Sequence, residues 1–316
     1  GVRHKQFDDY TVTIDQNAYI DQLNVLRFGT EFDALDDTTP LDEKWSAIYA
    51  TLLGSLSWLV GTRHDIAVYV CALQRAAKAP LKAHLVKANK LTKFCKRQRY
   101  ETRFKPLNGK LRLLAVSDAA FRKEDKAGLS IRGTFILLAT TQQDTPGGDV
   151  HCLEAFSRKQ RRVVRSTFGA EVNAQIDAHD LARLIAMALQ QLFTPNATAQ
   201  GILGIEEKGP YRVPVECVTD CRSLFEALAQ RELRVPTEMP LILPLHCLKE
   251  GLDLDTLGRL QALWWVCTED MVADGLTKGS CAREPIIAML RTGIWKLQLA
   301  RSSYTRSGGV RNYGTT

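Results

Sequence analysis

The first third of the chain shows the hydrophobic period of helices. Up to about residue 105, apolar positions recur near every 3.6 residues, which is typical of amphipathic helices packed on one core. The pattern predicts a strand at 10–16 and helices over 17–26, 44–60, 65–79 and 81–99. Pro80 ends the third of these helices, because proline lacks the N–H that continues the ladder.

The pattern changes after a turn signal formed by Pro106 and Asn108-Gly109, which we interpret as a domain boundary. Strands are predicted over 111–116, 128–140, 151–156, 213–219 and 262–267, with helices over 166–193, 223–230 and 240–251 and a short helical piece holding Asp274. This order predicts an α/β fold, a mixed sheet with flanking helices, over residues 106–300. The polar residues 301–316 are predicted to be a disordered tail.

Glu171 interrupts the apolar face of the long helix, for which Ser166 or Thr167 is available as N-cap. At about 100° per residue, Glu171 falls on the same stripe as Ala178 and Ala182. An unpaired charge that enters a core is costly, so this carboxylate needs a cation, a proton or a basic partner. The alternative is a glutamate in a frayed first turn that simply reaches water.

Three more acidic residues lie at the ends of predicted elements. Asp118 closes the first strand of the sheet, Asp220 closes the fourth, and Asp274 follows the fifth. Strand ends tend to converge on one edge of such a sheet, and carboxylates gathered there repel one another unless cations neutralise them. Oxygen ligands favour Mg²⁺ or Mn²⁺, and two such ions about 3.5–4 Å apart would suit attack of water on a phosphodiester. Each acid taken alone is equally explained as a turn or cap residue.

Composition narrows the class of protein. Of the 316 residues, 45% are hydrophobic and 24% charged, which is typical of a soluble globular protein, and no run of about 18 apolar residues could span a membrane. The eight cysteines form no Cys-x-x-Cys pair, which favours reduced thiols in an intracellular setting over a disulfide framework. Cys217 and Cys221 flank Asp220, but no second ligand pair is spaced to complete a zinc site.

The net charge of +7 is concentrated in two basic blocks. One extends from Lys82 to Lys105, and the other is Arg158-Lys159-Gln160-Arg161-Arg162. Such blocks fit a polyanionic partner, with a merely solvated face as the alternative. Together with the acidic residues, they favour a protein that binds nucleic acid.

Five motifs carry a resemblance to a known family. They are Ser117-Asp118-Ala119-Ala120, Ser157-Arg158-Lys159-Gln160, Ser166-Thr167-x-x-Ala170-Glu171, Thr219-Asp220-Cys221-Arg222-Ser223, and Trp265 to Lys278 with its ending Ala273-Asp274-Gly275-Leu276-Thr277-Lys278. From Leu111 to Lys278 the chain resembles the ribonuclease H domain of copia-type (Pseudoviridae-like) retrotransposon polyproteins. The segments Tyr49–Leu59 and Thr62–Ala67 are similar to the same family's region just after the polymerase palm.

The resemblance implies a ribonuclease-H-like fold in residues 106–300, preceded in 1–105 by a mostly helical thumb-side remnant of a reverse transcriptase. It implies that Asp118, Glu171, Asp220 and Asp274 hold two Mg²⁺ (or Mn²⁺) ions that cleave the RNA strand of an RNA·DNA hybrid. The implied phosphate-contacting residues are Arg158, Lys159, Arg161 and Arg162, with Lys93, Lys96 and Arg97 holding the hybrid upstream. The implied partners are the hybrid and the rest of the polyprotein, in a cytoplasmic virus-like particle or the nucleus.

The chain departs from the family pattern at His64, where proline is usual, and at two places after Leu111. Cys221-Arg222 replaces the usual Asn-Gln, and Met239-Pro240 stands where Lys-His is usual. Both replacements leave the four acids unchanged and are expected to affect the positioning of the hybrid and the turnover rate. The Tyr-x-Asp-Asp turn of a polymerase would lie before Gly1, so we expect no polymerase activity. The alternatives are a degenerate or domesticated fragment that binds nucleic acid without cleaving it, and a structural tether for the polymerase.

Overall fold

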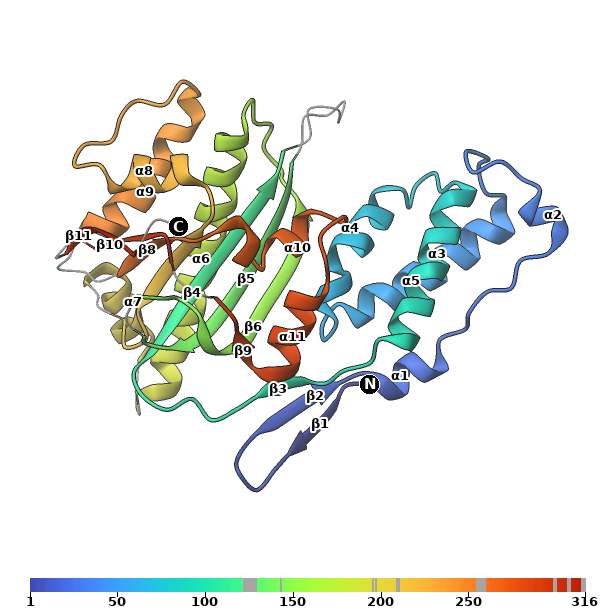
Figure 1. The fold of residues 1–316 in the computed structure, drawn as a ribbon, viewed down its shortest axis with the longest axis horizontal. Coiled ribbons are helices and arrows are strands. Elements are labelled where there is room, and N and C mark those ends of the chain that lie inside the picture. The colour runs from blue at the N-terminus through green and yellow to red at the C-terminus, as the bar shows by residue number, and fades with distance from the viewer. Residues whose placement is uncertain are drawn as a thin grey trace.

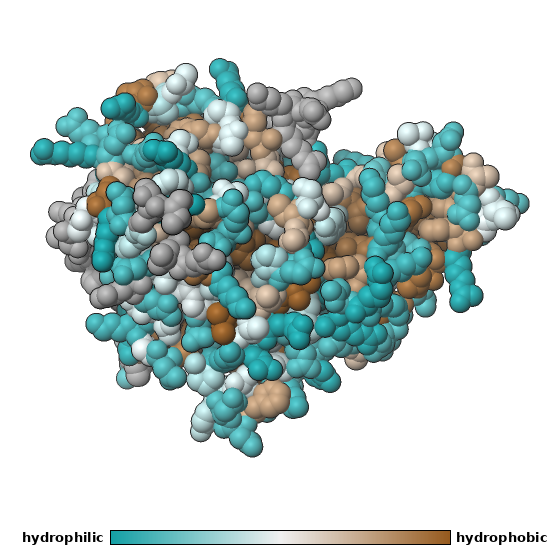
Figure 2. Space-filling model, viewed as in Figure 1, coloured by the Kyte–Doolittle hydropathy of each residue, from teal (hydrophilic) through white to brown (hydrophobic). Residues whose placement is uncertain are grey.

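The computed structural model describes residues 1–121, 130–142, 144–194, 196, 198–208, 211–253, 260–297, 300–305 and 308–313. These residues form a helical part at the N-terminal end and a larger α/β part, which lie side by side (Figure 1). Hydrophilic side chains cover most of the face seen in Figure 2, and hydrophobic ones show mainly in a central band that reaches the helical part.

The helical part contains a small sheet and one hydrophobic core. Its antiparallel strands, in the order β1-β2-β3, are β1 (Arg3–Gln6), β2 (Val12–Asp15) and β3 (Thr102–Phe104). Its helices are α1 (Asn17–Gln22), α2 (Thr30–Asp33), α3 (Glu43–Leu59), the 3₁₀ turn η1 (His64–Ile66), α4 (Ala67–Arg75) and α5 (Lys82–Arg97). The predicted helices over 44–60, 65–79 and 81–99 are confirmed, because their apolar faces pack around buried residues such as Leu56 and Leu85.

The α/β part is organised around a mixed sheet of eight strands in the order β11-β10-β8-β7-β4-β5-β6-β9. The strands are β4 (Leu111–Ala120), β5 (Ile131–Thr140), β6 (Gly148–Lys159), β7 (Val215–Thr219), β8 (Ala262–Trp265), β9 (Ile294–Trp295), β10 (Ser302–Thr305) and β11 (Gly309–Asn312). Strand β4 pairs antiparallel with β5 and parallel with β7, which in turn pairs parallel with β8. The predicted mixed α/β fold is therefore confirmed.

Helices cover both faces of this sheet (Figure 1). They are α6 (Thr167–Phe193), α7 (Ala199–Lys208), α8 (Arg222–Ala229), η2 (Met239–Leu241), α9 (Ile242–Asp253), η3 (Thr268–Asp270), α10 (Asp274–Thr277) and α11 (Glu284–Thr292). Because side chains alternate along a strand, Leu113 and Ala115 pack toward α6, whereas Leu114 and Val116 pack toward α10 and α11. Within the described helices, no segment is both long and apolar enough to cross a membrane.

The sequence predicts a disordered tail over 301–316, and the structure shows this to be wrong for the segments that form β10 and β11. Strand β10 pairs antiparallel with β8, with Ser302 opposite Trp265. Without β10, the edge of β8 would expose unpaired backbone groups, so a polar segment gains stability by adding to it. Tyr313, beyond β11, also stacks on Trp264 with ring centroids 6.1 Å apart.

The helical part packs against the sheet next to α10. Helix α4 contacts β6 and α10, and the hydroxyl of Tyr69 donates a 2.7 Å hydrogen bond to the carbonyl of Gly279. The ring of His64 meets the edge of Phe135 in β5, with centroids 6.4 Å apart. These contacts tie the segment after α10 to both parts of the molecule.

A buried ion pair lies at the centre of the helical part. Arg63 donates two hydrogen bonds, of 2.8 and 2.9 Å, to the carboxylate of Asp65, and the hydroxyl of Tyr100 donates a third of 2.7 Å. The side chains of Arg63 and Asp65 are only 2% and 0% exposed. This geometry satisfies both charges away from water.

We expect Asp65→Asn to lower the free energy of unfolding by about 3–5 kcal/mol, because the buried guanidinium of Arg63 would lose its counter-charge. Urea unfolding followed by circular dichroism measures the change. Asp21→Asn is the matched control, since Asp21 pairs with Arg99 at the surface and its loss should change stability little. Equal effects of the two substitutions would contradict a special role for the buried pair.

Candidate metal centre

Three aspartates from separate elements meet at one end of the sheet. Strand β4 runs on to Ala120, so Asp118 lies inside the strand and does not close it as the sequence predicts. Val116 of β4 lies opposite Val218 of β7 in the parallel register, so Asp118 lies beside Asp220, which directly follows β7. Asp274 is the first residue of α10. Each of the three offers a carboxylate oxygen, and these oxygens all lie within 4.8 Å of one another. The structure thus brings together the three aspartates that the strand-end pattern singles out.

A glycine allows α10 to approach this closely. Gly133 of β5 lies opposite Asp118 in the sheet. A Cβ atom added to it would lie 2.6 Å from Leu276 Cβ and 2.9 Å from the carbonyl oxygen of Ala273. Atoms cannot approach so closely, so a side chain here would push α10, and Asp274 with it, away from the sheet.

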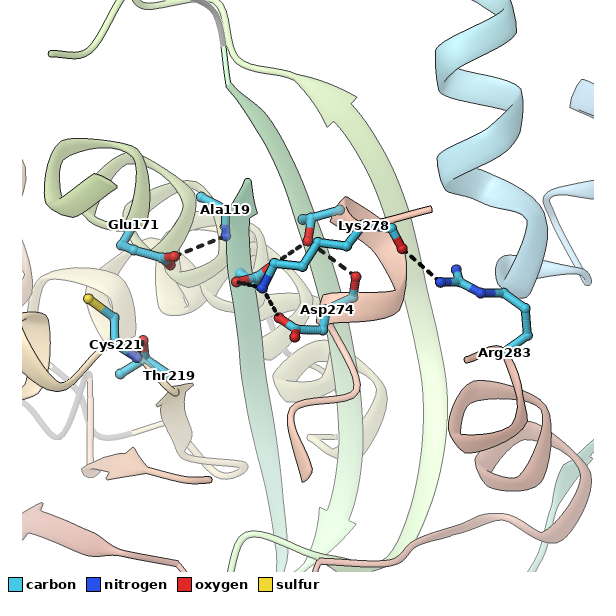
Figure 3. A network of polar contacts seen from close by, with 9 residues as sticks. Ala119, Glu171, Thr219, Cys221, Asp274, Lys278 and Arg283 are labelled. Atoms are coloured by element: carbon cyan, nitrogen blue, oxygen red, sulfur yellow. Dashed lines mark hydrogen bonds and ion pairs between the residues drawn. The ribbon is translucent and has the colours of Figure 1, made fainter. Parts of the chain in front are cut away.

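Two residues at the end of α10 bind the aspartates directly. The hydroxyl of Thr277 donates a hydrogen bond to Asp118. The ammonium of Lys278 lies 2.7 Å from Oδ1 of Asp274 and 3.7 Å from Oδ1 of Asp118 (Figure 3). Both residues belong to the motif that ends at Lys278, but no role is predicted for them from the sequence. The i,i+4 spacing of Asp274 and Lys278 is the signal that could have identified the ion pair.

Glu171 enters the core as its place on the helix predicts. Ser166 caps α6 by accepting a 3.0 Å hydrogen bond from the backbone N–H of Gly169, and Glu171 is only 5% exposed. Its Oε1 accepts a 3.3 Å hydrogen bond from the N–H of Ala119 (Figure 3). Its Oε2 is buried and has no hydrogen-bond partner in the part of the chain that the structure describes. The alternative of a frayed, hydrated glutamate is therefore wrong.

Glu171 adjoins the aspartates but is not in the group whose oxygens lie within 4.8 Å of one another. The hydrogen bond from the backbone N–H of Ala119 holds Glu171 next to β4, one residue along the strand from Asp118. An ion held by the three aspartates would have Glu171 as a further carboxylate nearby. The unpartnered Oε2 is the observation that fits such a cation, because a buried carboxylate oxygen without a donor is costly.

Burial controls the protonation of these acids. Burial, followed by the charge of Asp274, raises the pKa of Asp118 to about 7, while Lys278 opposes the shift. Burial also raises the pKa of Glu171 well above its ordinary value, with further contributions from Asp118 and Asp220. The pKa of Asp220 is raised for the same reasons, burial first and then Asp274. The site therefore favours a bound cation or proton.

The basic residues fall into two groups. Arg158 and Lys159 end β6 at the same end of the sheet as Asp118, since Ser157 pairs with Gly133 and Gly133 with Asp118. Arg161 and Arg162 follow in the next loop. Arg158 is exposed and lies 4.5 Å from the centre of the Phe156 ring. Lys93, Lys96 and Arg97 lie instead on α5, whose packing partners are α1, α3 and α4 in the helical part.

Of the departures from the family pattern, Arg222 lies near Asp220, whereas Pro240 lies in a turn next to the start of α6. Arg222 lies over the ring of Trp265 at 5.6 Å and pairs with Glu226. Asp220, Arg222 and Trp265 line a hollow with a volume of about 680 Å³. Pro240 lies in η2, where the preceding turn brings Glu238 to the N–H of Arg165 at 3.0 Å. The replacements thus line or support the region around the acids and leave the acids in place.

Comparisons with known proteins add little. Neither a protein-family model nor a curated protein matches the chain. Among solved structures, the chain is similar to LC11-RNase H1, isolated from compost by a metagenomic approach, with 14% identity and a TM-score of 0.30 over 54% of this chain and 93% of that chain. A similarity this low carries no argument, so the interpretation rests on the residues of this chain.

We expect the metal-free protein to lose stability as the pH rises from about 4 to about 7. The folded state holds the proton of Asp118 up to a pKa of about 7, while the unfolded value is near 3.8, so the folded state binds more protons in this window. Unfolding in EDTA at several pH values measures the slope. Asp118→Asn should flatten it, and an unchanged slope in that variant would contradict the assignment.

Proposed function

We propose that the chain is a metal-dependent nuclease of the ribonuclease H type, which hydrolyses the RNA strand of RNA·DNA hybrids. Its catalytic, metal-binding residues are Asp118, Glu171, Asp220 and Asp274. The observation that carries the proposal is the convergence of three aspartates, from β4, the end of β7 and α10, with oxygens within 4.8 Å of one another. These are the same positions that the retrotransposon-like motifs supply in the sequence.

The donor set suits two Mg²⁺ or Mn²⁺ ions, since it consists of carboxylate oxygens. When bound, such ions would activate water and stabilise the leaving oxygen. The chain's residues hold the acids in position: Ala119 fixes one oxygen of Glu171, and Thr277 orients Asp118. Because Asp118 and Glu171 have raised pKa values, both give up protons when a cation arrives.

The basic loop at the end of β6 is the proposed contact to the hybrid backbone. Arg158, Arg161 and Arg162 are exposed beside the carboxylate end of the sheet, where cations attract phosphate without reading sequence. Lys159 belongs to the same surface. The basic face of α5, with Lys93, Lys96 and Arg97, is proposed to hold a more distant part of the hybrid.

The retrotransposon context belongs to the same proposal. Residues 1–105 are proposed as the thumb-side remnant of a reverse transcriptase and 106–300 as the nuclease domain. Support comes from Arg63 and Asp65, which stand in one of the quoted motifs and form the buried ion pair of the helical part. The proposed partners are the hybrid and the rest of the polyprotein, in a virus-like particle or the nucleus.

A second candidate is a fragment that binds nucleic acid without cleaving it. One observation favours it: Lys278 already provides a positive charge to Asp274 and Asp118, where a metal ion would bind. The first candidate still explains more, because a protein that only binds phosphate has no need of four carboxyl groups beside its basic loop.

We expect the chain to cleave a labelled RNA·DNA hybrid in Mg²⁺, and Asp118→Asn and Glu171→Gln each to lower the rate at least about a hundredfold, more than is typical of a residue that only supports a ligand. Gel separation of the products measures the rate. Asp149→Asn is the matched control, since Asp149 is exposed at the opposite end of β6. Hybrid binding without cleavage by the unsubstituted chain would favour the second candidate.

We expect the double substitution Arg161→Gln with Arg162→Gln to weaken hybrid binding and to reduce the log–log salt slope by about 0.7–0.9 per lost phosphate contact. Fluorescence anisotropy in EDTA, over a range of salt concentrations, measures both quantities. Arg291→Gln serves as the control, because Arg291 is exposed on α11. An unchanged slope would remove the basic loop from the interface.

A further inference from the structure

Lys278 occupies an unusual position among the acids. It follows Asp274 by one helical turn, and its ammonium lies within 2.7 Å of one aspartate and 3.7 Å of another (Figure 3). Its side chain is 37% exposed, whereas those of Asp274 and Asp118 are 14% and 2% exposed. The cation thus reaches into a nearly dry cluster from a position that remains open to solvent.

The charge balance explains why a cation is needed there. Four carboxyl groups share this end of the sheet, and burial removes the water that would screen their repulsion. The ammonium of Lys278, 2.7 Å from Oδ1 of Asp274 and 3.7 Å from Oδ1 of Asp118, supplies positive charge that offsets this repulsion.

The ammonium and a divalent ion compete for the same oxygens. A magnesium ligand lies about 2.1 Å from the ion. The ammonium already lies 2.7 Å from Oδ1 of Asp274 and 3.7 Å from Oδ1 of Asp118, and both residues belong to the group of three aspartates. Two cations that share this oxygen at such distances would repel each other strongly, so binding of the ion requires that the ammonium move.

Hydrogen bonds hold the backbone around Lys278, whereas its side chain reaches solvent. Arg283 donates a 2.8 Å hydrogen bond to the carbonyl of Lys278. It also donates hydrogen bonds to the carbonyls of Gly275 and Cys281, the latter at 2.9 Å. Figure 3 shows Arg283 beside this segment. Tyr69 holds the carbonyl of Gly279 at 2.7 Å. These bonds fix the backbone on both sides, while the flexible four-carbon stem leads to solvent.

We propose that Lys278 is a built-in counter-ion: it holds Asp118 and Asp274 together in the metal-free protein and withdraws to solvent when a divalent cation binds. This inference rests on the proposed metal site and adds a positioning residue to it. Thr277 keeps its hydrogen bond to Asp118 throughout, because its hydroxyl is buried and carries no charge.

Calorimetric titration of Mn²⁺ into the full chain tests the exchange. Lys278→Met should bind Mn²⁺ about tenfold more tightly than the unsubstituted chain, a modest factor because the competing ion pair is partly screened by solvent. Lys278→Arg should bind near the unsubstituted affinity, since it keeps the charge. Lys110→Met is the control for lost charge, being exposed next to the opposite end of β4, and should change nothing. Without metal, Lys278→Met should melt at a lower temperature.

Unchanged or weaker Mn²⁺ binding by Lys278→Met overturns the proposal, and with hybrid cleavage intact in the unsubstituted chain it leaves the nuclease function standing. Absence of Mn²⁺ binding in every protein overturns both. Crystal structures of the unsubstituted chain with and without Mn²⁺ give a second test that needs no variant to fold. The ammonium should lie beyond hydrogen-bond distance of Asp274 when Mn²⁺ is present, and retention of the 2.7 Å contact would overturn the exchange.

Discussion

The approach of α10 to strand β5 is the contact on which the rest of the site depends. Gly133 has no side chain, so Leu276 and the backbone of Ala273 pack directly on the sheet. That contact brings Asp274, which follows β8 in the chain, to within reach of Asp118 in β4. The distance between the carboxylates of Asp118 and Asp274 therefore depends on packing, because a side chain at Gly133 would hold α10 farther from the sheet.

The arrangement of acids that suits the proposed function also lowers the stability of the metal-free fold. The acids are buried where a metal-free protein gains nothing from their charge, and burial raises the pKa values of Asp118, Glu171 and Asp220. Strain of this kind is typical of sites that are organised for a ligand rather than for the fold. Thr277 and Lys278 offset part of it, which explains why two polar side chains from α10 enter the cluster beside Asp274.

The sequence predicts the site better than its surroundings, for physical reasons. Strand ends and helical periodicity are local signals, and they are sufficient to single out Asp118, Asp220 and the core-facing Glu171. The role of Lys278 depends on how closely α10 packs on Gly133, a contact between distant segments that no local pattern encodes. Strands β10 and β11 were missed because edge strands can be polar, and polar composition alone also predicts disorder.

The strand order also determines when the site comes into existence during synthesis. Asp118 and Thr277, which share a hydrogen bond, are 159 residues apart. At about 5–20 residues per second, a ribosome needs roughly ten to thirty seconds to add that length. Until Thr219 is added, β4 also lacks its parallel neighbour β7, and contacts of such long range form slowly. A nascent chain therefore carries Asp118 without Thr277 or Lys278, and the three aspartates meet only after Asp274 has been added.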